Sequence, residues 1–149
     1  MKFSTREDID APIEQVYLAV SDFDGIERRI LRRGIDLTRD ETCPPDKVGA
    51  RWKANFKWRN RPYQLDAELV EMTEGQCYAI ESRVGGLECM GVVDLVSLSK
   101  SRTRMFVSLD LKPTTLSSRL MVQSLRLAKG SLNRRFKARV AQFASGIVG

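Results

Sequence analysis

The chain has 149 residues, the usual size of one domain and enough to bury about two-thirds of the unfolded surface. No apolar stretch reaches the roughly 20 residues of a membrane-spanning helix, and the charged N-terminus lacks a signal-peptide core, so a cytoplasmic protein is expected. The net charge of +6 is not accompanied by a helix-turn-helix, RNP or zinc-finger pattern, so we expect no nucleic-acid partner.

The first part of the chain predicts one strand followed by two short helices. Residues 2–10 alternate with a period of two, as strands do. Pro12 then begins a helix over 12–20, because proline is favoured in the first turn. A second helix is expected over 23–33, and Gly34 ends it.

From residue 35 the period becomes two and stays near two for about eighty residues, which predicts six further strands. The consecutive apolar pair Leu69-Val70 predicts a bulge, and Gly85-Gly86 predicts a tight hairpin. The six strands are expected over 35–42, over 50–59, from Tyr63 onward, and over 76–84, 87–98 and 102–111.

The last segment, 117–147, returns to a helical period and predicts one continuous helix about 45 Å long. Its polar side carries arginine and lysine, so the helix is apolar on one side only. The apolar stripe consists of Met121, Leu125, Ala128, Leu132, Phe136, Val140, Phe143 and Ile147.

These elements predict an α+β fold in a single domain, 1–149, with a seven-stranded curved antiparallel sheet wrapped around the long C-terminal helix. The helix must bury its stripe, and the inner face of the sheet is the apolar surface of matching length. Because one helix does not fill a wide curved sheet, we expect an apolar cavity between the sheet and this helix. Its expected ligand-binding lining is Trp52, Phe56, Trp58, Tyr63, Leu65, Tyr78, Ile80, Met105, Val107, Leu125, Leu132 and Phe136.

Two short motifs resemble a known superfamily. Ile9 to Tyr17, followed by Asp22, resembles the strand-to-helix opening of the START/Bet v 1-like (SRPBCC) superfamily in its bacterial polyketide cyclase/dehydrase branch. Val48 to Trp52 resembles the glycine-led third strand of that branch, and the element order matches its helix-grip fold across nearly the whole chain. The resemblance implies a hydrophobic-ligand pocket under the terminal helix, in a superfamily of lipid carriers, quinone-binding proteins, receptors and cyclases.

The residue types limit the chemistry. The chain has no histidine, which removes the commonest general base and metal ligand, and its three cysteines lack CxxC spacing. We therefore expect no metal and no cofactor. The remaining catalytic candidates are inward carboxylates and tyrosines, namely Glu7, which shares a face with Phe3 and Ile9, and Tyr78, with Glu81 as a second carboxylate.

Three functions stay open. The first is binding or transport of a small hydrophobic ligand that is lipid-, quinone- or polyketide-like. The second is a cyclase or dehydratase that uses an inward carboxylate and tyrosine as acid and base. The third is contact with an anionic membrane or acidic partner through four clustered arginines, Arg28, Arg29, Arg32 and Arg33.

Overall fold

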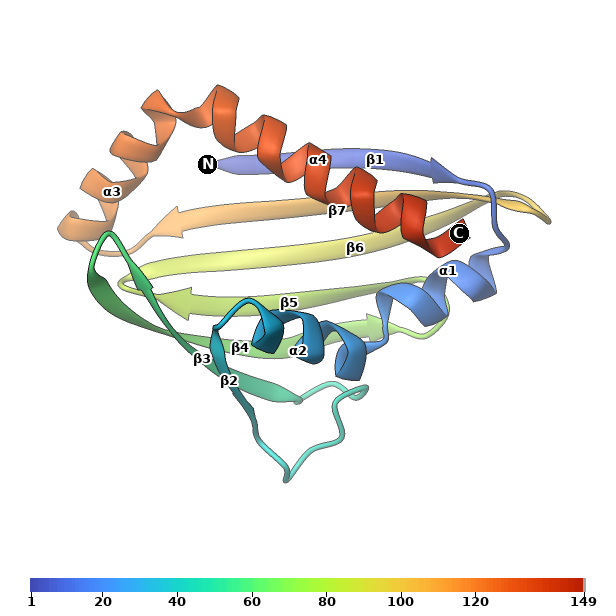
Figure 1. Ribbon diagram of the computed structural model, residues 1–149, viewed down its shortest axis with the longest axis horizontal. Helices are drawn as coiled ribbons and strands as arrows, with labels where there is room; N and C mark the ends of the chain where they lie inside the picture. The colour runs from blue at the N-terminus through green and yellow to red at the C-terminus, as the bar shows by residue number, and fades with distance from the viewer. Residues whose placement is uncertain (149) are drawn as a thin grey trace.

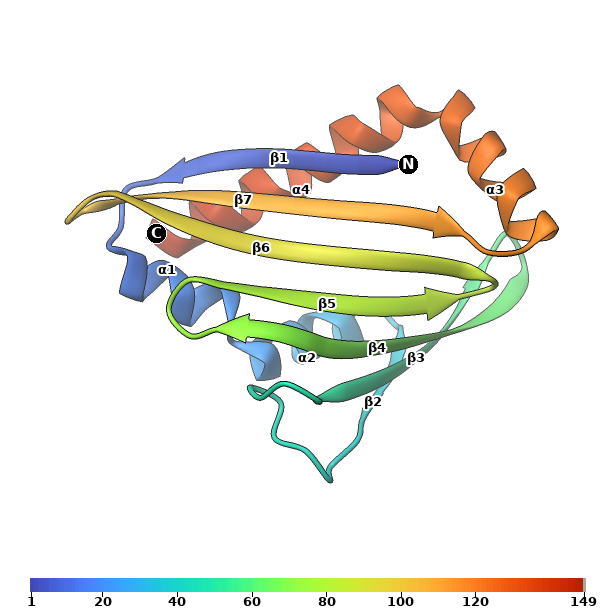
Figure 2. The same cartoon turned by 180° about the vertical axis from the view of Figure 1, so that it is seen from behind.

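The computed structural model describes residues 1–148, in which four helices lie on one side of a seven-stranded antiparallel sheet (Figure 1, and from behind in Figure 2). The predicted element order is confirmed up to the C-terminal segment. The strands are β1 (Lys2–Ile9), β2 (Asp36–Arg39), β3 (Arg51–Trp58), β4 (Arg61–Thr73), β5 (Cys77–Val84), β6 (Leu87–Ser99) and β7 (Arg102–Pro113). The helices are α1 (Ile13–Val20), α2 (Phe23–Arg32), α3 (Leu116–Leu127) and α4 (Lys129–Val148).

The sheet has the strand order β1-β7-β6-β5-β4-β3-β2, so β1 and β2 are its two edges. The predicted bulge is present, because the β4–β5 register shifts between Leu69 and Glu71. Gly85 and Gly86 form the predicted hairpin turn, both with positive φ, a conformation that glycine adopts without steric cost. β2 is shorter than the predicted 35–42, since only Asp36–Arg39 pair with β3.

Register identifies the inner face of the sheet. Trp52 pairs with Ala67, and Ala54 pairs with Leu65, so the apolar side chains of β3 and β4 lie on the same face of the sheet. Leu69 in turn pairs with Ile80 of β5. This continuous apolar face lies toward α2, whereas Arg51 and Lys53 of β3 line a hollow on the other side.

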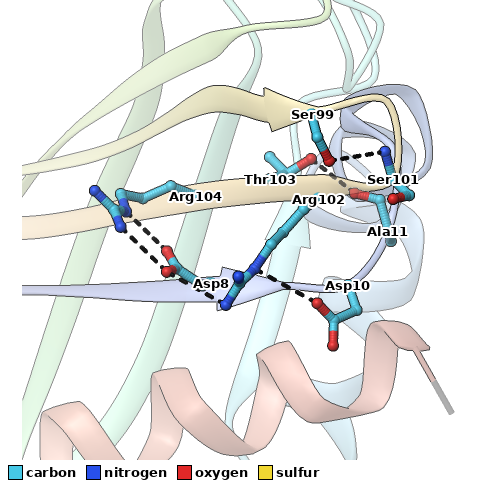
Figure 3. A network of polar contacts seen from close by, with 8 residues as sticks. All are labelled: Asp8, Asp10, Ala11, Ser99, Ser101, Arg102, Thr103 and Arg104. Atoms are coloured by element: carbon cyan, nitrogen blue, oxygen red, sulfur yellow. Dashed lines mark hydrogen bonds and ion pairs between the residues drawn. The ribbon is translucent and has the colours of Figure 1, made fainter.

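A polar network holds β1 against β7 where the chain turns into α1 (Figure 3). Arg104 donates two hydrogen bonds to the Asp8 carboxylate, at 2.8 and 3.1 Å. This contact with Arg104 holds the pKa of Asp8 below its usual value. The buried Thr103 hydroxyl donates to the Ala11 carbonyl at 2.8 Å, and so ties the start of the helical segment to the sheet.

The C-terminal segment is two helices rather than the one continuous helix predicted. Ala128 leaves helical geometry, with φ −104° and ψ 14°, and the chain bends there (Figure 1). The bend lets α3 pack beside β7 while α4 runs along β1. At 1.5 Å per residue, the 20 residues of α4 span about 30 Å, so a long C-terminal helix remains.

The core has two parts. The larger one joins α1, α2 and the C-terminal half of α4 to the sheet, with Val16, Leu69 and Met105 among its fully buried side chains. The smaller one is formed by Phe3, Leu87, Leu111 and Val122, with residues of α3 and α4 packed against it. The C-terminal helices thus cover the β1–β7 side of the sheet, and α2 is left to cover the other side.

Candidate functional site

An apolar pocket of about 280 Å³ lies between α2 and the inner face of β2 to β5. Its walls come from α2, the segment that leads into β2, and alternate residues of β3, β4 and β5. They are formed by Phe23, Ile26, Glu27, Ile30, Ile35, Leu37, Trp52, Ala54, Phe56, Leu65, Ala67 and Ile80.

The sequence builds this pocket from two periodicities. On α2, Phe23, Ile26 and Ile30 recur at three- and four-residue spacing, so they face the sheet together. On β3, every second residue faces inward, which brings Trp52 and Phe56 to either side of a small alanine. The small alanine side chains on β3 and β4 leave room that larger residues would occupy.

The polar groups at the pocket are concentrated at Glu27. Its carboxylate accepts a hydrogen bond from the Trp52 indole nitrogen at 2.6 Å and lies 3.2 Å from the Arg39 guanidinium. Arg39 also pairs with Asp24 at 2.8 Å, and this hydrogen bond raises the pKa of Arg39. The Glu27 side chain is only 19% exposed, so these contacts hold its carboxyl group at the edge of an apolar space.

The pocket is not where the sequence predicted it. We expected a cavity under the C-terminal helix, but this pocket lies under α2. The bend at Ala128 is the physical reason, because it directs α4 along β1 and leaves the inner face of β3 and β4 to α2.

The predicted lining residues therefore divide into groups. Trp52, Phe56, Leu65 and Ile80 line the pocket. Val107 packs against the larger core, which includes the buried Tyr78 and Met105. The three predicted residues of the C-terminal helices pack against the smaller core instead; they are Leu125, Leu132 and Phe136.

Trp58 and Tyr63 extend the pocket wall toward the β3–β4 hairpin. The Tyr63 ring stacks on Phe56 at 5.8 Å and lies 6.3 Å from the Trp58 ring. Trp58 is exposed, and the Arg59 guanidinium lies 4.5 Å above its ring. A row of aromatic rings thus leads from Phe56 in the pocket to the surface.

The predicted catalytic candidates do not meet in the pocket. Glu7 shares the phase of Phe3 and Ile9 as expected, but it lies on β1, at the opposite edge of the sheet, where it pairs with Met105 of β7. The Tyr78 hydroxyl donates to the Val20 carbonyl at 2.7 Å, and burial raises its pKa. Glu81 lies in the other phase of β5 and forms an ion pair with Arg83 at 3.3 Å.

The sequence interpretation missed Glu27 and Arg39, although each carried a signal. Glu27 lies one residue after Ile26 within the apolar stripe of α2, where a carboxylate is unusual. Arg39 follows Leu37 in the inward phase of β2. A charged residue of each sign on two facing apolar surfaces favours an ion pair between them, and here the pair is half-buried.

A second hollow, of about 730 Å³, lies on the outer face of β2 to β5 and is lined mainly by charged side chains. These charges pair with each other, as Arg51 does with Glu68 at 3.0 Å. Within residues 1–148, no group of three or more acidic or cysteine side chains is placed to hold a metal ion. We therefore take the apolar pocket as the candidate site.

No family model and no curated protein matches the chain, but solved structures do. A Thermus thermophilus protein, TTHA0849, is 13% identical, with a TM-score of 0.68 over 99% of this chain and 97% of that one. Norcoclaurine synthase from Thalictrum flavum, in complex with dopamine and hydroxybenzaldehyde, is 14% identical, with a TM-score of 0.68 over 99% and 86%. The Zhui aromatase/cyclase from Streptomyces sp. R1128 is 10% identical, with a TM-score of 0.64 over 99% and 93%.

The seven-stranded sheet, the long C-terminal helix and these neighbours define the chain as a helix-grip protein of the START/Bet v 1-like fold. Identities of 10 to 14% establish the fold alone. None of the helices within residues 1–148 is both long and apolar enough to cross a membrane.

Proposed function

We propose that the chain binds a small, largely apolar ligand in the pocket between α2 and the sheet. The observation that carries this proposal is an apolar pocket with one polar cluster at its edge, since ligand sites combine apolar walls with a few placed polar groups. An apolar cavity of about 150 Å³ binds benzene. A pocket of about 280 Å³ therefore suits a ligand of roughly two fused rings.

The polar cluster limits the ligand further. Glu27 lines the pocket, its carboxylate lies at the edge bound to Trp52 and Arg39, and a carboxylate accepts hydrogen bonds but donates none. The favoured ligand is therefore aromatic or lipid-like with one hydroxyl or amine directed toward Glu27. Trp52 and Arg39 hold the carboxylate in position through the contacts at 2.6 and 3.2 Å.

Fluorescence tests this proposal directly, because Trp52 lies in the pocket wall and the chain's other tryptophan is Trp58. In a Trp58→Phe background, 1-naphthol should change Trp52 emission with saturation. Ala54→Leu should weaken binding at least tenfold by filling the pocket. The matched control is Ala138→Leu, the same change at an exposed position of α4, which should leave binding unchanged.

Glu27→Gln separates pocket binding from recognition of the polar group. The glutamine oxygen still accepts from Trp52, but the charge is lost. We expect 1-naphthol to lose its advantage over naphthalene while naphthalene binding is unchanged. If neither compound binds saturably, and native mass spectrometry of the purified protein finds no bound molecule, the proposal is rejected.

A cyclase or dehydratase activity is the second candidate, and the observation in its favour is also Glu27. Norcoclaurine synthase and the Zhui aromatase/cyclase share the fold. Acid–base chemistry needs a carboxylate within reach of the ligand, and Glu27 lines the pocket whereas Glu7 lies on the far edge strand. If the protein converts a bound ligand, Glu27→Gln should abolish turnover and Glu7→Gln should not.

The arginine cluster of α2 remains a candidate contact for an anionic partner. Arg28, Arg29, Arg32 and Arg33 lie along one short stretch of the helix and its C-cap, and the Arg29 guanidinium lies 5.1 Å above the Phe143 ring of α4. Arg29 thus also connects the wall of the pocket to the C-terminal helix. Sedimentation with anionic liposomes, compared between the wild type and a variant with all four arginines changed to serine, tests this contact.

A further inference from the structure

The charges of the chain are unevenly divided at Asp110, the last acidic residue in the sequence. Residues 111–149 contain eight lysines and arginines and no aspartate or glutamate, whereas residues 1–110 contain 17 basic and 19 acidic residues. The net positive charge of the protein therefore belongs to the C-terminal helical segment. A concentration of one sign of charge on one part of a molecule attracts polyanions.

Helix α3, at the start of this segment, exposes leucines on the side opposite its packed face. Leu116, Leu120 and Leu127 are 74%, 57% and 93% exposed. Their spacing of four and seven residues places them on one side of the helix, while Ser118 and Val122 are buried on the other. Arg119 and Arg126 flank these leucines in the sequence of the same helix.

The β3–β4 hairpin lies at the same end of the molecule. The Gly86 carbonyl accepts from the Thr114 backbone just before α3, and a Cβ added to the adjacent Gly85 would be 3.3 Å from the Tyr63 ring. Tyr63 contacts the exposed Trp58. The turn between β3 and β4, with Trp58, Arg59 and Arg61, therefore lies at the end of the molecule where α3 begins (Figures 1 and 2).

We propose that this end of the protein docks on the surface of an anionic lipid bilayer. The α3 surface is defined by three leucines, one tryptophan and four arginines: Leu116, Leu120, Leu127, Trp58, Arg59, Arg61, Arg119 and Arg126.

Each residue type suits one layer of a membrane interface. Leucines on one side of a helix enter the boundary between headgroups and acyl chains, and tryptophan is favoured at that depth. Arginines beside them contact anionic headgroups. Nucleic acid and acidic proteins would use the charge but leave the leucines exposed to water, whereas a bilayer accounts for both features.

The α3 surface differs from the α2 arginine cluster in its charge balance. Helix α2 and its N-cap carry Asp22, Asp24 and Glu27 together with the arginines. Helix α3 carries Arg119 and Arg126 and no acidic residue. Mutations in the two surfaces can therefore separate the two membrane-binding hypotheses.

Vesicle flotation tests the proposal. The full chain is mixed with vesicles of phosphatidylcholine alone, or with about 30% phosphatidylglycerol, a composition on the order of anionic biological surfaces. We expect binding to the anionic vesicles only, reduced by added salt. Leu116→Gln/Leu120→Gln/Leu127→Gln should reduce partitioning at least tenfold, and Arg119→Gln/Arg126→Gln about 25-fold, since each basic residue near the surface contributes about fivefold.

Matched controls make the same changes elsewhere. Leu18→Gln/Leu31→Gln removes two exposed leucines from α1 and α2, and Arg6→Gln/Lys53→Gln removes two exposed basic residues from β1 and β3, outside both basic surfaces. Both control variants should bind like the wild type. Absence of binding to anionic vesicles, equal binding to neutral vesicles, or equal loss in the control variants would each overturn the proposal. Binding of 1-naphthol is measured in parallel, so loss of docking is distinguished from loss of the pocket.

Discussion

Two buried tyrosines allow the loss of a hydroxyl group to be compared with and without a hydrogen-bond partner. Tyr17 and Tyr78 are 9% and 7% exposed, and both lie in the larger core. The Tyr78 hydroxyl donates to the Val20 carbonyl at 2.7 Å. Within residues 1–148, the buried Tyr17 hydroxyl has no hydrogen-bond partner. Burial raises the pKa of Tyr17, and the nearby backbone of Gly75 opposes part of that rise.

Replacing each tyrosine by phenylalanine should therefore give different results. Tyr78→Phe removes one hydrogen bond and leaves the Val20 carbonyl unsatisfied, which costs about 1–2 kcal/mol. Tyr17→Phe removes a buried hydroxyl that lacks a full partner, so the free energy of unfolding should change by less than about 0.5 kcal/mol or increase. Both variants keep the ring and its packing.

Urea unfolding followed by circular dichroism measures both effects. With a slope of about 2 kcal/mol per molar urea, Tyr78→Phe should lower the midpoint by about 0.5–1 M. The corresponding fall in melting temperature is about 3–6 °C. If both variants lost the same stability, the hydrogen-bond assignment in this core would be refuted.

Three further measurements test other contacts. Arg104 lowers the pKa of Asp8 in the folded protein below its usual 3.8. The ionised Asp8 therefore stabilises the fold above pH 3.8, and this stabilisation is lost as the pH falls through the pKa of Asp8 in the folded protein. The stability difference between the wild type and Asp8→Asn should therefore shrink from about pH 6 to about pH 2 in urea titrations. Gly86→Ala should cost more than Gly75→Ala in melting temperature, because both have positive φ but only a Cβ at Gly86 meets a side chain, at 2.6 Å. Arg29→Gln should lose about 0.5–1 kcal/mol of unfolding free energy through its contact with an aromatic ring of α4, whereas Arg28→Gln should be neutral.

Most of the fold could be predicted from the sequence, because the period of two over the strands and the turn residues between them are local signals. The bulge after Leu69 and the turn at Gly85-Gly86 were predicted correctly for this reason. The break at Ala128 could not be predicted from periodicity, since alanine is a good helix former and the apolar stripe continues across it. Gly130, two residues later, lowers helix propensity by about 1 kcal/mol and was the available sign of a weak point.

The sequence analysis placed an apolar cavity under the C-terminal helix, whereas the apolar pocket of the structure lies under α2. Its location depends on which helix covers which strands, and that depends on the angle at Ala128 rather than on the pattern within either helix. The local periods mark Glu27 and Arg39 as charged residues on apolar faces, but they do not identify the two as partners, because their contact joins α2 to β2. Trp52, one of the predicted lining residues, lies in the pocket wall because strand alternation places it on the inner face.

The pocket and the α3 surface are connected by the aromatic row that runs from Phe56 through Tyr63 to Trp58. Phe56 lines the pocket, and Trp58 is exposed at the end of the molecule where α3 begins. A row of aromatic rings beside the pocket would reduce the apolar area that a ligand exposes to water if it entered from a bilayer at this end. If the proposed ligand site and the proposed docking surface are both correct, they belong to one arrangement, because a ligand that is poorly soluble in water is most concentrated in the membrane.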